Sequence, residues 1–123
     1  MKILVTDDSK MARKMVIKIL NDVLNENVEV FEGQNGQEAF DLYKEHLPEI
    51  VFLDLTMPVM NGFEALSKIK EFDKNAKVVI ISADIQKLSM DKALQLGAFN
   101  FIKKPIDLEK MQQILGKINE LDK

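Results

Sequence analysis

Residues 78–82 read VVIIS, four consecutive β-branched apolar residues followed by a serine. A strand with one face in water alternates apolar and polar side chains, whereas a run without alternation indicates a strand covered on both faces. Four other short apolar runs lie at residues 3–6 (ILVT), 28–31 (VEVF), 50–53 (IVFL) and 99–102 (FNFI). The runs begin about 21 to 28 residues apart, so each interval can hold one helix and two short loops.

The segments that follow the runs carry the periodicity of amphipathic helices. The apolar residues at helical spacing are Met11, Met15, Ile19 and Val23 beside Ala12, Val16, Leu20 and Leu24; Ala39, Leu42 and Tyr43; Phe63, Leu66 and Ile69; and Leu108, Met111, Ile114, Leu115 and Ile118. Leu88, Leu94 and Leu96 fit a further helix between the third and the last of these. Asn35 and Glu38 have the spacing of a capping box, and Asp107 precedes the last stripe as an N-cap. Gly97 follows this further helix, as is typical of a helix C-terminus. We therefore expect five helices.

Five alternations of strand and helix predict an α/β fold with a parallel sheet and helices on both faces. We expect a flavodoxin-like, doubly wound sheet of five parallel strands in the order 2-1-3-4-5. Ligands bind such sheets at the carboxyl ends of the strands, where the strand order reverses. The first and third strands flank that reversal, so the residues after them are the first candidates for a functional site.

Length and composition limit the class of protein. The chain has 123 residues, 46% hydrophobic and 30% charged, which fits a single folded domain over residues 1–123 with no output domain. The net charge of −3 argues against a nucleic-acid surface, and no signal peptide or membrane-spanning run is apparent. The absence of cysteine excludes disulfides and thiolate metal sites, and we expect a cytoplasmic protein. The single histidine, His46, is interpreted as a solvated or capping residue rather than a metal ligand.

Polar residues lie at the carboxyl ends of four of the five predicted strands. Asp7 and Asp8 follow the first strand, Asp54 the third and Lys104 the fifth, and Ser82 ends the fourth. Each has an ordinary structural explanation, as a turn residue or as a helix cap, for which Ser9 competes with Asp8. Their common position at the expected ligand-binding edge instead predicts a functional site.

The residue types at this edge favour one kind of chemistry. Neighbouring carboxylates such as Asp7 and Asp8 repel each other unless a cation compensates their charge. Oxygen ligands without sulfur or imidazole favour Mg²⁺, which binds carboxylates together with water and phosphoryl oxygens. A carboxylate can also act as a nucleophile and become an aspartyl phosphate. The set therefore predicts a phosphoryl-transfer site that uses Mg²⁺.

The sequence resembles the receiver domain of two-component response regulators, of the single-domain, CheY-like type. The segments that carry the resemblance are VTDDS at 5–9, DLTMPVMNG at 54–62, SA at 82–83 and KP at 104–105. The resemblance implies that Asp54 accepts a phosphoryl group from a phosphohistidine on a histidine kinase. It also implies that Asp7, Asp8, Asp54 and the backbone carbonyl of Thr56 hold Mg²⁺, with Asp7 acting through water.

Other residues receive roles from the same resemblance. Ser82 and Lys104 are expected to contact the phosphoryl group, and the Lys104–Pro105 peptide bond is expected to be cis. Thr56 and Asp84 flank the path of the water that removes the phosphoryl group, so they should tune its lifetime. Phe101 occupies the position of a switch aromatic that is tyrosine in many members, and it can also be an ordinary strand residue.

One further expectation concerns the loop after Asp54. The NG pair at residues 61–62 shapes this loop, and Gly62 is expected at a positive φ angle.

The resemblance further implies a phosphoacceptor signalling protein, which promotes its own phosphorylation and dephosphorylation, rather than an enzyme. Phosphorylation should shift the population towards an altered face formed by the fourth helix, the fifth strand and the fifth helix. That face should control a partner protein in chemotaxis, such as a flagellar motor component or a phosphatase. The alternatives are a single-domain phosphorelay intermediate and an adaptor that works without phosphorylation. The protein is expected to be a monomer or a phosphorylation-dependent dimer.

Three other classes share features with this sequence. A flavodoxin needs a neutral phosphate-binding loop after the first strand, where this chain has TDDS. A cobalamin-binding domain needs a histidine in the corresponding loop, and His46 lies elsewhere. A phosphatase of the haloacid dehalogenase type needs a second aspartate two residues after the nucleophile, where Thr56 stands.

Overall fold

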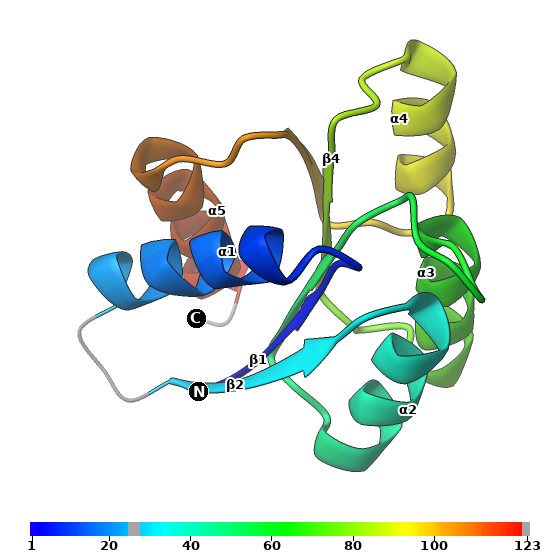
Figure 1. The fold of residues 1–123 in the computed structure, drawn as a ribbon, viewed down its shortest axis with the longest axis horizontal. Helices are drawn as coiled ribbons and strands as arrows, with labels where there is room; N and C mark the ends of the chain where they lie inside the picture. Colours follow the sequence, from blue (N-terminus) through cyan, green and yellow to red (C-terminus); the bar gives the residue numbers. More distant parts are fainter. Residues whose placement is uncertain (25–27, 122–123) are drawn as a thin grey trace.

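The computed structural model describes residues 1–24 and 28–121, in which strands and helices alternate strictly along the chain (Figure 1). The elements are β1 (Lys2–Thr6), α1 (Lys10–Val23), β2 (Glu29–Gly33), α2 (Gly36–His46), β3 (Ile50–Leu53), α3 (Gly62–Phe72), β4 (Val78–Ser82), α4 (Lys87–Gln95), β5 (Asn100–Lys103) and α5 (Leu108–Leu121). The predicted order of elements is confirmed.

The five strands form one parallel sheet in the order β2-β1-β3-β4-β5, as predicted. β2 begins one residue and ends two residues later than expected, because Gly33 still pairs with Thr6 of β1. β5 is shifted by one residue, because Lys103 pairs with Ser82 of β4. The fold class is therefore flavodoxin-like, and β1 and β3 lie side by side where the strand order reverses.

Each face of the sheet carries its own hydrophobic core. α1 and α5 cover one face, and α2, α3 and α4 cover the other (Figure 1). Alternate residues of β1 serve the two cores: Ile3 and Val5 pack towards α1 and α5, and Leu4 packs towards α2 and α3. All five residues of β4 are buried, which confirms that VVIIS is covered on both sides.

The predicted helix caps are present. Ser9, rather than Asp8, caps α1 through a bond from the amide of Ala12. Asn35 caps α2, but Glu38 accepts from the amide of Gln34 instead of closing a capping box on Asn35. The carboxylate of Asp107 accepts from the amide of Lys110 at the start of α5, and Gly97, with φ of 101°, follows α4. Local capping signals therefore set most helix boundaries.

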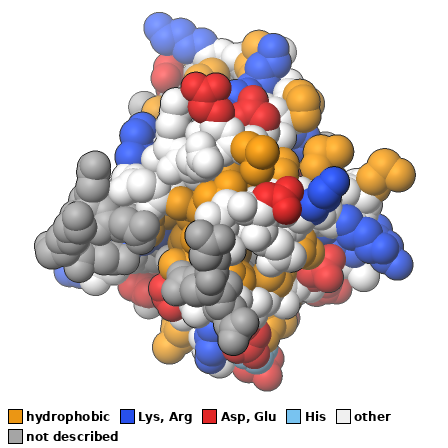
Figure 2. Space-filling model, turned by 90° about the vertical axis from the view of Figure 1, so that its left-hand side faces the viewer, with side chains coloured by type: hydrophobic (Ala, Val, Ile, Leu, Met, Phe, Trp, Pro, Cys, Tyr) orange, Lys and Arg blue, Asp and Glu red, His pale blue; other side chains and the backbone are white. Residues whose placement is uncertain are grey.

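The two apolar rows of α1 differ in burial. Val16 and Leu20 are buried, whereas Met11 is 78% exposed and Met15 is 48% exposed. Figure 2 views the molecule from the side of α1 and α5 and shows hydrophobic side chains at the surface between charged ones. Val16 and Leu20 therefore pack most deeply, and in the other row Ile19 and Val23 pack against the same core at partial burial.

α4 is attached more weakly than its sequence suggests. Of the leucines that predicted its buried stripe, Leu88 is 82% exposed and Leu94 is 50% exposed. Ala93 is the buried residue within α4. The N-terminus of this helix, at Gln86, has no hydrogen bond from a capping side chain. Of the predicted residues, Leu96 packs against the core, whereas Leu88 and Leu94 do not, because α4 lies over an edge of the sheet, where it contacts β5 and α3. A helix with so little buried apolar surface is easily displaced.

Replacing Tyr43 with phenylalanine is expected to lower the free energy of unfolding by about 1–2 kcal/mol. The Tyr43 hydroxyl donates to Asp73 Oδ2 at 2.7 Å, which joins α2 to the end of α3, and the ring is buried. The Tyr43 hydroxyl and the Asn75 amide hold the pKa of Asp73 below its usual range. This stabilisation is therefore present at neutral pH and is lost as Asp73 becomes protonated in acid.

Urea denaturation of both proteins at pH 7 and near pH 3 measures this difference. Asp73→Asn, which keeps an acceptor but removes the charge, is the matched control. A Tyr43→Phe effect that is equally large at both pH values would contradict the proposed role of the charged acceptor.

No helix in the described part of the chain is long and apolar enough to span a bilayer.

Candidate functional site

The site lies at the carboxyl ends of β1 and β3. Asp7 and Asp8 directly follow β1, and Asp54 directly follows β3. The Asp54 amide donates to the Thr6 carbonyl at 3.1 Å, so the sheet ladder places Asp54 beside the end of β1. The adjacency of β1 and β3 thus brings together residues that are 47 positions apart in the sequence.

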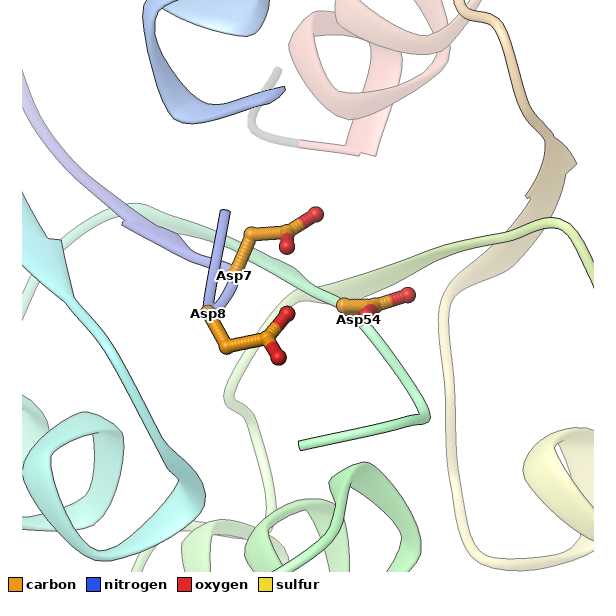
Figure 3. A group of neighbouring side chains, drawn as sticks. All are labelled: Asp7, Asp8 and Asp54. Carbon is orange, nitrogen blue, oxygen red and sulfur yellow. The ribbon is translucent and has the colours of Figure 1, made fainter. Parts of the chain in front are cut away.

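The three carboxylates form a compact group (Figure 3). One oxygen from each of Asp7, Asp8 and Asp54 can be chosen so that all three lie within 4.8 Å of one another. Asp7 and Asp54 are 6% and 7% exposed, whereas Asp8 is exposed. The predicted convergence of these aspartates is therefore present in the structure.

Lys104 supplies the positive charge of the site. Its Nζ atom lies 2.8 Å from Asp7 Oδ2 and 3.4 Å from Asp54 Oδ1. The Lys104 amide donates to the Ser82 carbonyl at 2.9 Å, which continues the pairing of β5 with β4 beyond the last strand residue. The Lys104–Pro105 peptide bond is cis, as predicted.

Burial and neighbouring charges shift two pKa values. Burial raises the pKa of Asp54 to about 6; the Lys104 charge opposes this rise and the Asp7 charge adds to it. Burial lowers the pKa of Lys104, but the Asp7 hydrogen bond and the Asp54 charge outweigh burial and raise it overall. Lys104 therefore stays charged, and Asp54 is ionised at neutral pH at an energetic cost.

The donor set fits a hard divalent cation. Three carboxylate oxygens at this spacing, without sulfur or imidazole, match the ligands that Mg²⁺ prefers. Within the described residues the carboxylate of Asp8 makes no hydrogen bond or ion pair, so it is free to bind a ligand. Thr56 is exposed two residues after Asp54, and its carbonyl accepts no hydrogen bond from the described backbone. These residues can therefore hold a metal ion.

Ser82 and Asp84 connect the site to α4. Ser82 is buried, and its Oγ accepts from the amide of Asp84 at 3.0 Å. Asp84 Oδ2 accepts from the Ser89 hydroxyl of α4 at 2.7 Å, and Asp84 Oδ1 accepts from the Gln86 amide. The chain of hydrogen bonds runs from the end of β4 into the first turns of α4.

Phe101 lies in β5, pairs with Ile80 and is half-buried against the core under α2, α3 and α4. This placement fits both a switch residue and an ordinary strand residue. Its predicted role as a switch stays a prediction, as does the role of Thr56 and Asp84 in the phosphoryl lifetime.

The conformation expected of Gly62 is wrong. The loop residue at positive φ is Val59, at 67°, and Gly62 is not in that region. A Cβ atom at Gly62 would overlap the carbonyl oxygen of Asp54 and lie 2.6 Å from Leu55 Cα. The position requires glycine because α3 begins directly against the backbone that carries Asp54, and not because of its φ angle.

Two residues at the site escaped the sequence analysis. Arg13 of α1 is buried and donates from Nη1 to the carbonyl of Asp7 at 2.7 Å. Its Nε donates to Glu32 Oε1 of β2 at 3.0 Å. Arg13 stands three and seven residues before Val16 and Leu20, so a charge on the buried face of the helix was the available signal.

A hollow of about 270 Å³ adjoins the carboxylates. It lies between α1 and the segment before α5, and its lining includes Met11, Met15, Pro105 and Ile106 as well as Asp54. Met11 and Met15, the exposed apolar residues of α1, thus border the site.

Comparisons with known proteins agree with this geometry. The family model for the response regulator receiver domain matches residues 3–116. The chain is 39% identical to the chemotaxis protein CheY of Bacillus subtilis over 116 residues, which cover 94% of this chain and 95% of the relative. It is 42% identical to the chemotaxis protein CheY of Treponema pallidum, covering 95% and 81% of the two chains.

A solved structure is similar in both sequence and fold. It is the complex of CheX, CheY, BeF₃ and Mg²⁺ from Borrelia burgdorferi, with 38% identity and a TM-score of 0.88. The match covers 96% of this chain and 88% of the matched chain.

Proposed function

Because this chain belongs to the family of response regulator receiver domains, we propose that it is a phosphoacceptor of two-component signalling in which Asp54 receives the phosphoryl group from a histidine kinase. The observation that carries the proposal is the position of the Lys104 ammonium, 2.8 Å from Asp7 and 3.4 Å from Asp54. The carboxylate of Asp8 lies beside them. This arrangement supports a site in which Asp54 is the nucleophile, Lys104 is the cation and the carboxylates bind a metal ion.

In the proposed reaction, an ionised oxygen of Asp54 attacks the phosphorus of a phosphohistidine. The new P–O bond forms as the P–N bond breaks, and the bonding electrons return to the imidazole nitrogen. Lys104 then pairs with a phosphoryl oxygen, and Ser82 Oγ donates to another. Asp8, Asp54 and the Thr56 carbonyl would hold Mg²⁺, with Asp7 acting through water. Bound Mg²⁺ supplies positive charge to the phosphoryl oxygens.

The hydrogen bonds around Asp84 support a route from phosphorylation to α4. If Ser82 Oγ turns to the phosphoryl group, the Asp84 amide loses its acceptor. Asp84 is also bound to Ser89 of α4, a helix in which Ala93 is the buried residue. We propose that the face of α4, β5 and α5 changes its population of states in this way.

The surface of β5 and α5 supports the predicted kind of partner. A hollow between these elements is lined by Lys103, Lys110 and Lys117 together with Phe101. Such a surface favours a partner segment with acidic and apolar side chains. The similarity to CheY proteins supports chemotaxis as the pathway, with a phosphatase or a motor component as partner.

The proposal is tested by intact-protein mass spectrometry after incubation with acetyl phosphate and Mg²⁺. We expect one added phosphoryl group on the wild type, none without metal and none on Asp54→Asn. Asp41→Asn, the same change at an exposed position on α2, is the matched control and should be modified like the wild type.

Absence of an adduct is followed by titration with beryllofluoride, because rapid hydrolysis would also hide the product. A protein whose amide NMR spectrum does not respond to beryllofluoride and Mg²⁺ would overturn the proposal. The phosphorylation-independent adaptor would then be the better account.

A further inference from the structure

Asp7 is fixed through all of its polar groups. Its amide donates to the Gly33 carbonyl at 3.1 Å, and its carboxylate accepts from the Ser9 amide and from Lys104. Its carbonyl accepts from Arg13 Nη1 at 2.7 Å. The carbonyl bond comes from a charged side chain that, within residues 1–24 and 28–121, makes no hydrogen bond or ion pair with any of the three carboxylates.

The Asp7 carbonyl controls the direction of Asp8. The peptide unit between them is planar, so fixing the carbonyl of Asp7 also fixes the nitrogen and Cα of Asp8. The carboxylate of Asp8 is exposed and makes no hydrogen bond within the described residues, and the peptide unit on its other side is held by the Ser9 amide, which donates to Asp7 Oδ1 at 2.9 Å. Arg13 therefore holds the first of the two peptide units that orient this potential metal ligand.

The guanidinium of Arg13 is suited to this task. It is planar and presents two donors in a fixed relation, Nε to Glu32 and Nη1 to Asp7. Its side chain is 8% exposed, and a buried cation is retained only when it is paired. Glu32 provides the pairing from β2, the same strand that receives the Asp7 amide at Gly33.

We propose that Arg13, held by Glu32, is a positioning residue that orients the Asp7–Asp8 turn and thereby sets the metal affinity of the carboxylate group. This inference rests on the proposed function, because it takes Mg²⁺ as the ligand of the three carboxylates.

The charge of Arg13 and its hydrogen bond to the Asp7 carbonyl should have opposite effects on Mg²⁺ affinity. A nearby cation repels Mg²⁺, so removal of the Arg13 charge alone should strengthen metal binding. Loss of the orienting hydrogen bond should instead weaken it, because groups that orient metal ligands typically contribute about 10-fold to 100-fold to metal affinity. The two explanations predict changes of opposite sign.

The experiment is a Mg²⁺ titration of the full chain by isothermal calorimetry, without any phosphoryl donor. Arg13→Gln is expected to raise the dissociation constant for Mg²⁺ about tenfold or more. Lys14→Gln is the matched control, because it removes the same charge from the neighbouring, exposed position of α1 and should leave the constant within about twofold. Arg13→Lys keeps the charge but not the two-donor geometry, and is also expected to bind weakly.

A readout without metal accompanies the titration. Hydrogen exchange at the Asp7 amide should become faster in Arg13→Gln and stay unchanged in Lys14→Gln. Circular dichroism establishes that each variant is folded, and Glu32→Gln provides a milder disruption if Arg13→Gln does not fold.

The outcomes separate this inference from the proposed function. A wild type that does not bind Mg²⁺ would overturn the metal site and the inference with it. A wild type that binds, together with a folded Arg13→Gln, Arg13→Lys or Glu32→Gln that binds equally well or more tightly, would overturn the inference alone.

Discussion

Replacing Gly62 with alanine is expected to lower the free energy of unfolding by about 3 kcal/mol or more. The added methyl group would overlap the carbonyl oxygen of Asp54 and lie 2.9 Å from the carbonyl carbon of the same residue. Both are backbone atoms at the end of a buried strand, so they cannot turn aside as a flexible side chain could. The Gly62 amide also donates to the Leu55 carbonyl at 2.9 Å, which prevents α3 from moving away without losing a hydrogen bond.

Gly116 offers a matched control within the same chain. It lies in α5, is exposed, and a Cβ atom there would have no neighbour within 4 Å. Alanine at this position should stabilise the protein by about 0.5–1 kcal/mol, because glycine is the poorer helix former. Urea denaturation of both variants at pH 7 gives the comparison. If the free energy of unfolding of Gly62→Ala is less than about 1 kcal/mol below that of the wild type, a rigid contact between α3 and Asp54 is contradicted.

The sequence predicted those parts of the fold that depend on local patterns. Strand positions followed from apolar runs, and helix starts followed from side chains such as Ser9, Asn35 and Asp107. The strand order needed the regular alternation of elements, which permits few arrangements. Once that order was given, the convergence of Asp7, Asp8 and Asp54 followed without further information.

The failures concern contacts made across the fold. The Gly62 prediction assumed a local reason for glycine, whereas the reason is the approach of another backbone segment. Leu88 and Leu94 are apolar residues of a helical segment, but the sequence alone does not say that α4 lies at a sheet edge with little to bury them. The contacts of Arg13 could not be predicted because its partners lie in different parts of the sheet: Asp7 is in the turn after β1 and Glu32 is in β2.

Replacing Asp54 with asparagine is expected to stabilise the metal-free protein at neutral pH by about 2 kcal/mol. Burial raises the pKa of Asp54 from 3.8 to about 6, and this difference corresponds to at most about 3 kcal/mol. Well below pH 4, Asp54 is protonated in both the folded and the unfolded protein. Between about pH 4 and pH 6 the folded protein binds the extra proton, so stability falls as the pH rises through this range. The advantage of Asp54→Asn should therefore appear above pH 6 and vanish well below pH 4.

Urea denaturation in the presence of a chelator, at pH 7.5 and well below pH 4, measures this dependence. Asp8→Asn makes the same change at the exposed member of the carboxylate group and should alter stability less. An Asp54→Asn variant that is less stable than the wild type at pH 7.5 would mean that attraction to Lys104 outweighs the burial of the charge. Addition of Mg²⁺ should stabilise the wild type more than the variant, because a ligand of the folded state stabilises it in proportion to its affinity. The charge that is expected to weaken the metal-free fold is thus the same charge that the proposed function requires for binding a cation and for attacking phosphorus.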